Sequence, residues 1–126
     1  MYTVAVRREL VARHFLVGGD FGHENSPHAH TYRIEFRLAG NTLDEHGFLV
    51  DIDAVAGRMD AALPRFRDAL LNDLPEFRGL NPSVEHLARI LCRAFRTGLT
   101  APGALEAAVT VRESADAWAA FSEPLA

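Results

Sequence analysis

Three histidines of this chain have the residue type and spacing of a metal site. His28 and His30 are two residues apart at the start of an alternating stretch, so both point to one face of a strand. His14 lies in an earlier alternating stretch, where it shares the parity of the apolar side chains. If the two strands pair as a hairpin, the three imidazoles converge. Three histidine nitrogens with an open fourth position are typical of a catalytic zinc, although a buried histidine pair also occurs with hydrogen-bond partners alone.

The other histidines have settings without this convergence. His23 and His46 fall in loop-like segments, and His86 falls on the expected surface of a helix. We expect all three to be solvated side chains.

The elements that must position the histidines follow from the hydrophobic period. Alternation predicts strands, and an apolar residue every three or four positions predicts helices. We expect strands at 2–16 and 31–38 around a loop at 17–29, helices at 53–63 and 82–96, and a closing hairpin of 107–113 with 117–122.

This order, β-β-α-α-β-β, predicts one α+β domain over residues 1–126, with a four-stranded antiparallel sheet and two helices on one face. Exposed edge strands of such a sheet favour pairing between subunits. Asp51 or Asp53 is expected to cap the first helix. Asn81 is expected to cap the second, with Pro82 at its first position. Cys92 lies at an expected core position of that helix, which indicates packing.

Composition excludes several classes of protein. The 126 residues carry 13 basic and 17 acidic side chains, a net charge of −4, which argues against a nucleic-acid surface. No apolar run is long enough to span a membrane. With one cysteine and no basic-then-apolar start, the chain is expected to be cytoplasmic and free of intrachain disulfides.

Several short motifs, in order along nearly the whole chain, resemble the 6-pyruvoyl-tetrahydropterin synthase and 6-carboxytetrahydropterin synthase family. The histidine segments resemble its zinc-binding segments, with Ala29 in place of the usual glycine in its His-Gly-His-x-Tyr motif. The matching segments are Ala12-Arg13-His14-Phe15, His28-Ala29-His30-Thr31-Tyr32, Gly47-Phe48-Leu49-Val50-Asp51-Ile52, Leu71-Asn72, Asn81-Pro82-Ser83-Val84-Glu85 and Val111-Arg112-Glu113-Ser114.

The resemblance implies a tunnelling fold (T-fold), in which three subunits join their sheets into a barrel and two trimers form a homo-hexamer. It implies zinc on the three histidines and a small-molecule pterin substrate, with no nucleic-acid or membrane partner. Glu113 would grip the guanidine-like edge of the pterin through two hydrogen bonds, a geometry that suits a carboxylate; an ion pair with an arginine is the alternative. Ser83 and Glu85 would help to line the pocket, although Glu85 also suits the first turn of a helix.

Two catalytic positions depart from the family pattern. The usual cysteine, four residues before the His-Gly-His motif, is Glu24 here, and the usual Asp-His pair is Arg67-Asp68. Glu24 can act as the base if partial burial raises its pKa, and Asp68 can act as a proton relay. The alternative for each is a solvated acid.

We therefore expect a zinc-dependent lyase that acts on the side chain of dihydroneopterin triphosphate or a related reduced pterin. A glutamate in place of the cysteine resembles a branch of the family associated with side-chain cleavage. The alternatives are a zinc- and pterin-binding carrier or regulator without synthase activity, and a new reaction on a related bicyclic substrate. The pathway stays open between queuosine, folate, biopterin and a specialised product.

Overall fold

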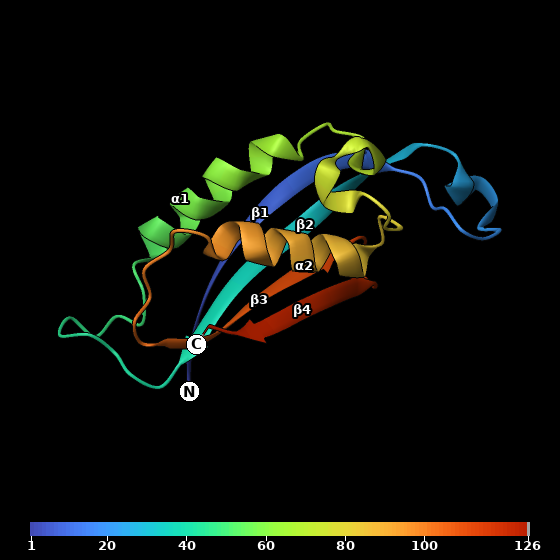
Figure 1. Cartoon of the computed structure of the whole chain (residues 1–126). Coiled ribbons are helices and arrows are strands. Elements are labelled where there is room, and N and C mark those ends of the chain that lie inside the picture. Colours follow the sequence, from blue (N-terminus) through green and yellow to red (C-terminus); the bar gives the residue numbers. More distant parts are fainter. Residues whose placement is uncertain (126) are drawn as a thin grey trace.

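The computed structural model describes residues 1–125, and its elements follow the predicted β-β-α-α-β-β order (Figure 1). Each strand begins or ends within a few residues of its predicted bounds. The elements are β1 (Tyr2–His14), β2 (His28–Gly40), α1 (Ile52–Ala62), α2 (Val84–Arg96), β3 (Ala104–Arg112) and β4 (Trp118–Pro124).

The four strands form one antiparallel sheet in the order β1-β2-β3-β4. In the hairpin of β1 and β2, Leu10 lies opposite Tyr32 and His14 lies opposite His28. Tyr32, Ile34, Phe36 and Leu38 are all at most 1% exposed, which confirms that this parity of β2 faces the core. The predicted pairing of the two histidine-bearing strands is therefore confirmed.

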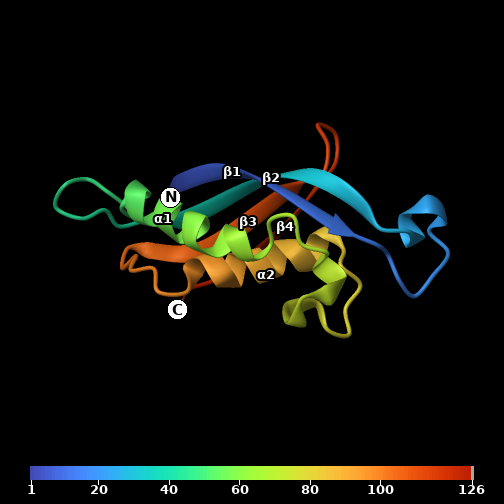
Figure 2. The same ribbon diagram turned by 90° about the horizontal axis from the view of Figure 1, so that it is seen from above.

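Both helices cover the same face of the sheet, with α2 over β3 and β4 and α1 beside it against β1 (Figure 2). Asp51 caps α1, because its side chain accepts a hydrogen bond from the backbone N–H of Asp53. The predicted cap of α2 is wrong: Ser83, and not Asn81, caps this helix, which begins after Pro82. Asn81 is engaged elsewhere, since its Oδ1 accepts from the backbone N–H of Val17 at 3.0 Å.

Cys92 lies on the buried face of α2 and is 0% exposed. Burial, with a smaller contribution from Glu123, raises the pKa of its thiol to about 11. A thiol with this pKa stays protonated near neutral pH and is a poor nucleophile and metal ligand. Its position fits the predicted packing role.

Residues 63–80 carry no periodic apolar pattern. They contain short 3₁₀ turns at Leu63–Arg65, Leu71–Asp73 and Pro75–Phe77. The segment around Asp68 runs along the free edge of β1, where the backbone N–H of Asp68 donates to the Val11 carbonyl at 2.7 Å. The backbone N–H of Arg13 donates in turn to the Ala69 carbonyl at 2.8 Å. This segment covers the end of the β1 edge next to His14. None of the helices within residues 1–125 is long and apolar enough to cross a membrane.

Candidate metal centre

The three predicted histidines converge at the end of the β1–β2 hairpin. His14 is the last residue of β1, His28 is the first of β2, and Ala12 of β1 lies opposite His30. The ring centroids of the three imidazoles are 4.6 to 5.0 Å apart, and one ring nitrogen from each lies within 4.8 Å of the others. The strand register thus brings the three histidines together, as strand parity predicted.

Backbone carbonyls orient two of the rings. His14 Nδ1 lies 2.8 Å from the Pro82 carbonyl oxygen, and His28 Nδ1 lies 2.8 Å from that of Ser26. Because a carbonyl can only accept, Nδ1 is the protonated nitrogen of both rings, and Nε2 keeps its lone pair. This is the arrangement that metal-ligating histidines adopt.

The Nε2 atoms of all three rings are buried and have no hydrogen-bond partner within residues 1–125. An unpaired buried polar atom is costly, so three at one place call for a further group. Three imidazole nitrogens are the preferred ligands of a catalytic zinc, and these residues therefore fit such an ion.

The surroundings of His14 favour its neutral form. Burial lowers the pKa of His14 below its ordinary value, and the nearby His28 and His30 lower it further. The hydrogen bond to the Pro82 carbonyl acts in the opposite direction and raises this pKa. The neutral imidazole is the form that binds a metal. Tyr32 packs against His30 with ring centroids 5.4 Å apart, and its burial raises the pKa of its phenol well above the usual range.

Two carboxylates approach the same cluster from the side of His30. Glu24, His30 and Glu113 each place one potential ligand atom within 4.8 Å of the others. Glu113 Oε1 lies 3.1 Å from His30 Nε2, which is close enough for an ion pair if the ring is protonated, although the geometry is not that of a hydrogen bond. Within residues 1–125, Glu113 pairs with this histidine and not with an arginine.

The loop between β1 and β2 holds Glu24 in place. Glu24 lies in a 3₁₀ turn, Gly22–Asn25, and its carbonyl accepts from the Leu16 N–H at 2.8 Å. The Asn25 side chain accepts from the Phe21 N–H at 2.8 Å and donates to the carbonyls of Leu16 and Gly19. These bonds close the loop on itself, so Glu24 is a partly buried residue of an ordered turn.

The other predicted site residues lie elsewhere or have local partners. Asp68 is exposed, has a positive φ of 59°, and belongs to neither group of converging residues in the described chain. The Ser83 hydroxyl accepts from the His86 N–H at 3.2 Å as the cap of α2, and Glu85 is exposed in the first turn of that helix. Their proposed contacts with a substrate remain predictions.

The remaining histidines are not all solvated. His23 is exposed, and the His46 side chain is 69% exposed beside Glu45. The expectation for His86 is wrong, because its ring is partly buried and Nδ1 lies 2.7 Å from the Asn81 carbonyl oxygen. That contact follows from the chain turning back on itself just before α2.

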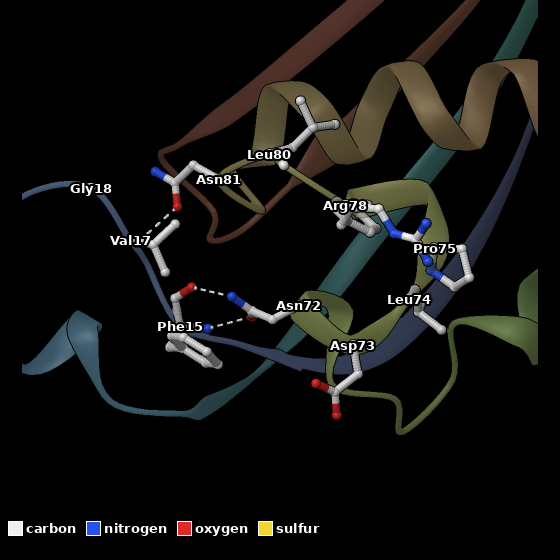
Figure 3. A pocket seen from close by; sticks show the side chains of 12 residues that line it. Phe15, Val17, Gly18, Asn72, Asp73, Leu74, Pro75, Arg78, Leu80 and Asn81 are labelled. Carbon is white, nitrogen blue, oxygen red and sulfur yellow. Dashed lines mark hydrogen bonds between the residues drawn. The ribbon is translucent and has the colours of Figure 1, made fainter.

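Two asparagines fix the strand end beside His14: sequence reasoning gave no role to Asn72 and expected Asn81 only as a helix cap. Asn72 accepts from the Phe15 N–H at 3.0 Å and donates to the Phe15 carbonyl at 2.9 Å, while Asn81 binds Val17 (Figure 3). They line a groove of about 700 Å³ that runs between this strand end and residues 72–81. The only signal in the sequence was their place in motifs, since an amide alone does not reveal its partner.

Replacing Asn72 by alanine should loosen the chain directly after His14. Two hydrogen bonds are lost, so we expect the free energy of unfolding to fall by about 1–3 kcal/mol and zinc affinity to fall by roughly tenfold. Urea denaturation and competition with a chromogenic chelator measure the two effects. Asn41→Ala, at an exposed position, is the matched control; equal zinc affinity in the Asn72 and Asn41 variants would contradict the assigned role.

One protein family matches nearly the whole chain. The sequence model of the family described as 6-pyruvoyl tetrahydropterin synthase matches residues 3–124. A search of curated proteins finds no match.

Among solved structures, the Caenorhabditis elegans 6-pyruvoyl tetrahydropterin synthase is 21% identical with a TM-score of 0.79, over 98% of this chain and 97% of that chain. The Plasmodium falciparum enzyme is 12% identical with a TM-score of 0.81, over 98% of both chains. A Plasmodium vivax enzyme, in a variant whose catalytic glutamate is replaced by alanine, is 14% identical with a TM-score of 0.76, over 99% of this chain and 100% of that chain. At these identities the structures establish a shared fold, and the predicted α+β T-fold is confirmed.

Proposed function

Because the chain belongs to the 6-pyruvoyl tetrahydropterin synthase family, we propose that it is a zinc-dependent lyase acting on the side chain of dihydroneopterin triphosphate or a related reduced pterin. The observation that carries this proposal is the convergence of three buried Nε2 atoms without hydrogen-bond partners in residues 1–125. His14, His28 and His30 would hold the ion. When bound, zinc would polarise the oxygens of the substrate side chain and lower the pKa of its hydroxyls.

Glu24 is the proposed general base. Its carboxylate is near His30, so it could accept a proton from a side-chain hydroxyl of a substrate held beside the histidines. The Plasmodium vivax relative is described as having a catalytic glutamate, which gives a glutamate base a precedent in this fold. We propose that Glu24 takes the proton of the second side-chain hydroxyl, so that this oxygen becomes an aldehyde carbonyl and the bond between the first two side-chain carbons breaks. The electron pair of that bond would pass to the C6–N5 imine of the ring, and the first side-chain carbon would then regain a proton. The proposed products are 6-hydroxymethyl-dihydropterin and a two-carbon aldehyde that keeps the triphosphate. The proposal assigns no step to Asp68.

Glu113 is the proposed anchor of the pterin ring. Its carboxylate could accept two hydrogen bonds from the guanidine-like edge of the ring and so orient the substrate side chain. Ser83 and Glu85, at the start of α2, are proposed to line the same pocket.

Glu113→Gln should therefore weaken pterin binding while the histidines keep their metal. A charge-assisted hydrogen bond contributes about 1.5–3 kcal/mol, so we expect affinity for neopterin to fall about 10- to 100-fold. Fluorescence titration measures the affinity, and metal analysis checks the zinc content. Glu106→Gln, an exposed change on β3, is the control; similar affinities in both variants would rule out the anchor.

The direct test of the proposed activity is incubation of the zinc-loaded chain with dihydroneopterin triphosphate, followed by mass spectrometry of the products. We expect a pterin with a shortened side chain, formed only when zinc is present. Tight pterin binding without turnover would contradict the lyase and support the carrier. Turnover that survives complete removal of zinc would contradict the metal requirement.

We also propose that the chain assembles as the homo-hexamer implied by its family. The edge strands β1 and β4 support this, because hydrogen-bonding groups along a free edge can pair with another subunit. Analytical ultracentrifugation of the purified protein gives the subunit number directly.

A further inference from the structure

The face of the sheet opposite the helices carries a group of charged side chains that the proposed reaction does not use. Successive side chains of a strand point to opposite faces, so Arg33 points away from the buried neighbours Tyr32 and Ile34. Opposite Arg33 lie Glu9 on β1 and Arg112 on β3. The group is therefore separated from the histidine cluster by the sheet itself.

One carboxylate of this face is fully engaged. Glu35 Oε2 accepts from Arg7 Nε at 2.8 Å, and Glu35 Oε1 accepts from Arg37 Nη1 at 3.0 Å. Hydrogen bonding to Arg7 above all lowers the pKa of Glu35, so this acid is ionised near neutral pH. Arg37 also donates to the hydroxyl of Thr110. Both carboxylate oxygens of Glu35 are thus bound to arginines, so neither is left to neutralise a third cation.

Arg33 and Arg112 are cross-strand neighbours and neither forms an ion pair within residues 1–125. Two like charges directly opposite each other on a sheet repel. The Arg112 guanidinium lies over the Trp118 ring, 5.6 Å from its centroid, a contact that holds it on this face. The two arginines therefore stand at neighbouring positions of this face, and neither has an acid partner within residues 1–125.

A cavity of about 320 Å³ opens at this pair. We call it the arginine cavity; its lining residues are Arg7, Arg33, Ile34, Glu35, Arg112 and Ala115. Its walls carry three arginines and a single acid that is already paired.

We propose that the arginine cavity binds a phosphate-type oxyanion between Arg33 and Arg112. Each guanidinium presents a planar fork of donors that matches two phosphate oxygens, and a bridging anion would turn the repulsion of the pair into attraction. The cavity is a second site, distinct from the metal centre on the other face of the sheet. A free phosphate or polyphosphate and the phosphate tail of a larger molecule share the chemistry that it recognises.

The test is calorimetric titration of the zinc-loaded protein with sodium phosphate and with sodium triphosphate at constant ionic strength. We expect binding that is about tenfold or more weaker in Arg33→Gln and in Arg112→Gln. Arg78→Gln, an exposed change before α2 at a residue that does not line the arginine cavity, should bind as the unchanged protein does. His28→Ala should also bind, since the anion does not depend on the metal centre.

Thermal unfolding with and without phosphate covers the case of a poorly folded variant. Without phosphate, Arg33→Gln should melt no lower than the unchanged protein, because the substitution removes a repulsion. With phosphate, the unchanged protein, Arg78→Gln and His28→Ala should each melt higher than without it, whereas Arg33→Gln and Arg112→Gln should not. Competition of inorganic triphosphate with dihydroneopterin triphosphate that disappears in Arg33→Gln would identify the phosphate tail of a larger molecule as an occupant of the arginine cavity, and triphosphate binding without such competition would identify a free anion. Undiminished binding in both Arg33→Gln and Arg112→Gln, or an equal loss in Arg78→Gln, would overturn the proposal.

Discussion

His28→Ala protein is expected to purify with less than about 0.1 zinc per chain, against about one in the unchanged protein. Because removing one of three nitrogen ligands leaves two, the affinity for zinc should fall by at least ~100-fold. This effect is larger than that of losing a group that only orients a ligand. Plasma emission spectrometry after dialysis against a weak chelator measures the metal content.

His46→Ala is the matched control, because His46 is exposed and belongs to neither converging group of the described residues. It should keep its full zinc content. Circular dichroism of both variants checks that the sheet is intact. Full zinc retention by a folded His28→Ala protein would refute the histidine centre.

Glu24→Gln is expected to lower kcat for the proposed cleavage by about 10²–10⁴-fold, the usual contribution of a general base. The amide has nearly the shape of the carboxylate, so the loop and its hydrogen bonds to Asn25 and Leu16 should persist. KM for the substrate and the zinc content should change little, because Glu24 is proposed to move a proton and not to anchor the ring.

Steady-state kinetics with zinc-loaded protein measures this effect, and Glu45→Gln, at an exposed loop position, serves as the control. Unchanged kcat in Glu24→Gln would exclude Glu24 as the base even if the lyase itself were established. Loss of zinc in the same variant would instead assign Glu24 to metal binding.

Local patterns in the sequence predicted the sheet and the histidine cluster well. The period of two in β2 determines which side chains are buried, and His28 and His30 share the parity of Tyr32. A strand register that slipped by one residue would have turned every side chain to the other face, so burial of the apolar parity also fixes the direction of the histidines.

The sequence predicted less where long-range contacts decide the outcome. Asn81 and Ser83 both have side chains that cap helices well. In the folded chain the Asn81 side chain accepts a hydrogen bond from the Val17 N–H, and Ser83 caps α2. The carbonyls of Pro82 and Ser26 that orient two histidines cannot be foreseen, because every residue carries a carbonyl. Residues 63–80 have no period at all, so their course along β1 could not be predicted.

Glu24 shows the same limit at the candidate site. Its position four residues before His28 did not determine where its carboxylate lies, because the loop contains residues with positive φ such as Gly18 and Gly22. The hydrogen bonds of Asn25 select one conformation of that loop, and they bring Glu24 to the side of His30. The nearness of base and metal ligands is thus a property of the folded loop.

X-ray absorption spectroscopy at the zinc edge tests the central claim most directly, because it reports the ligands of the bound ion in the intact protein. The account predicts three imidazole nitrogens at about 2.0–2.1 Å and the remaining coordination by oxygen. A sulfur ligand at about 2.3 Å would have to come from Cys92, which is the chain's single cysteine. That result, or a shell without imidazole, would contradict the assignment of His14, His28 and His30 as the metal centre.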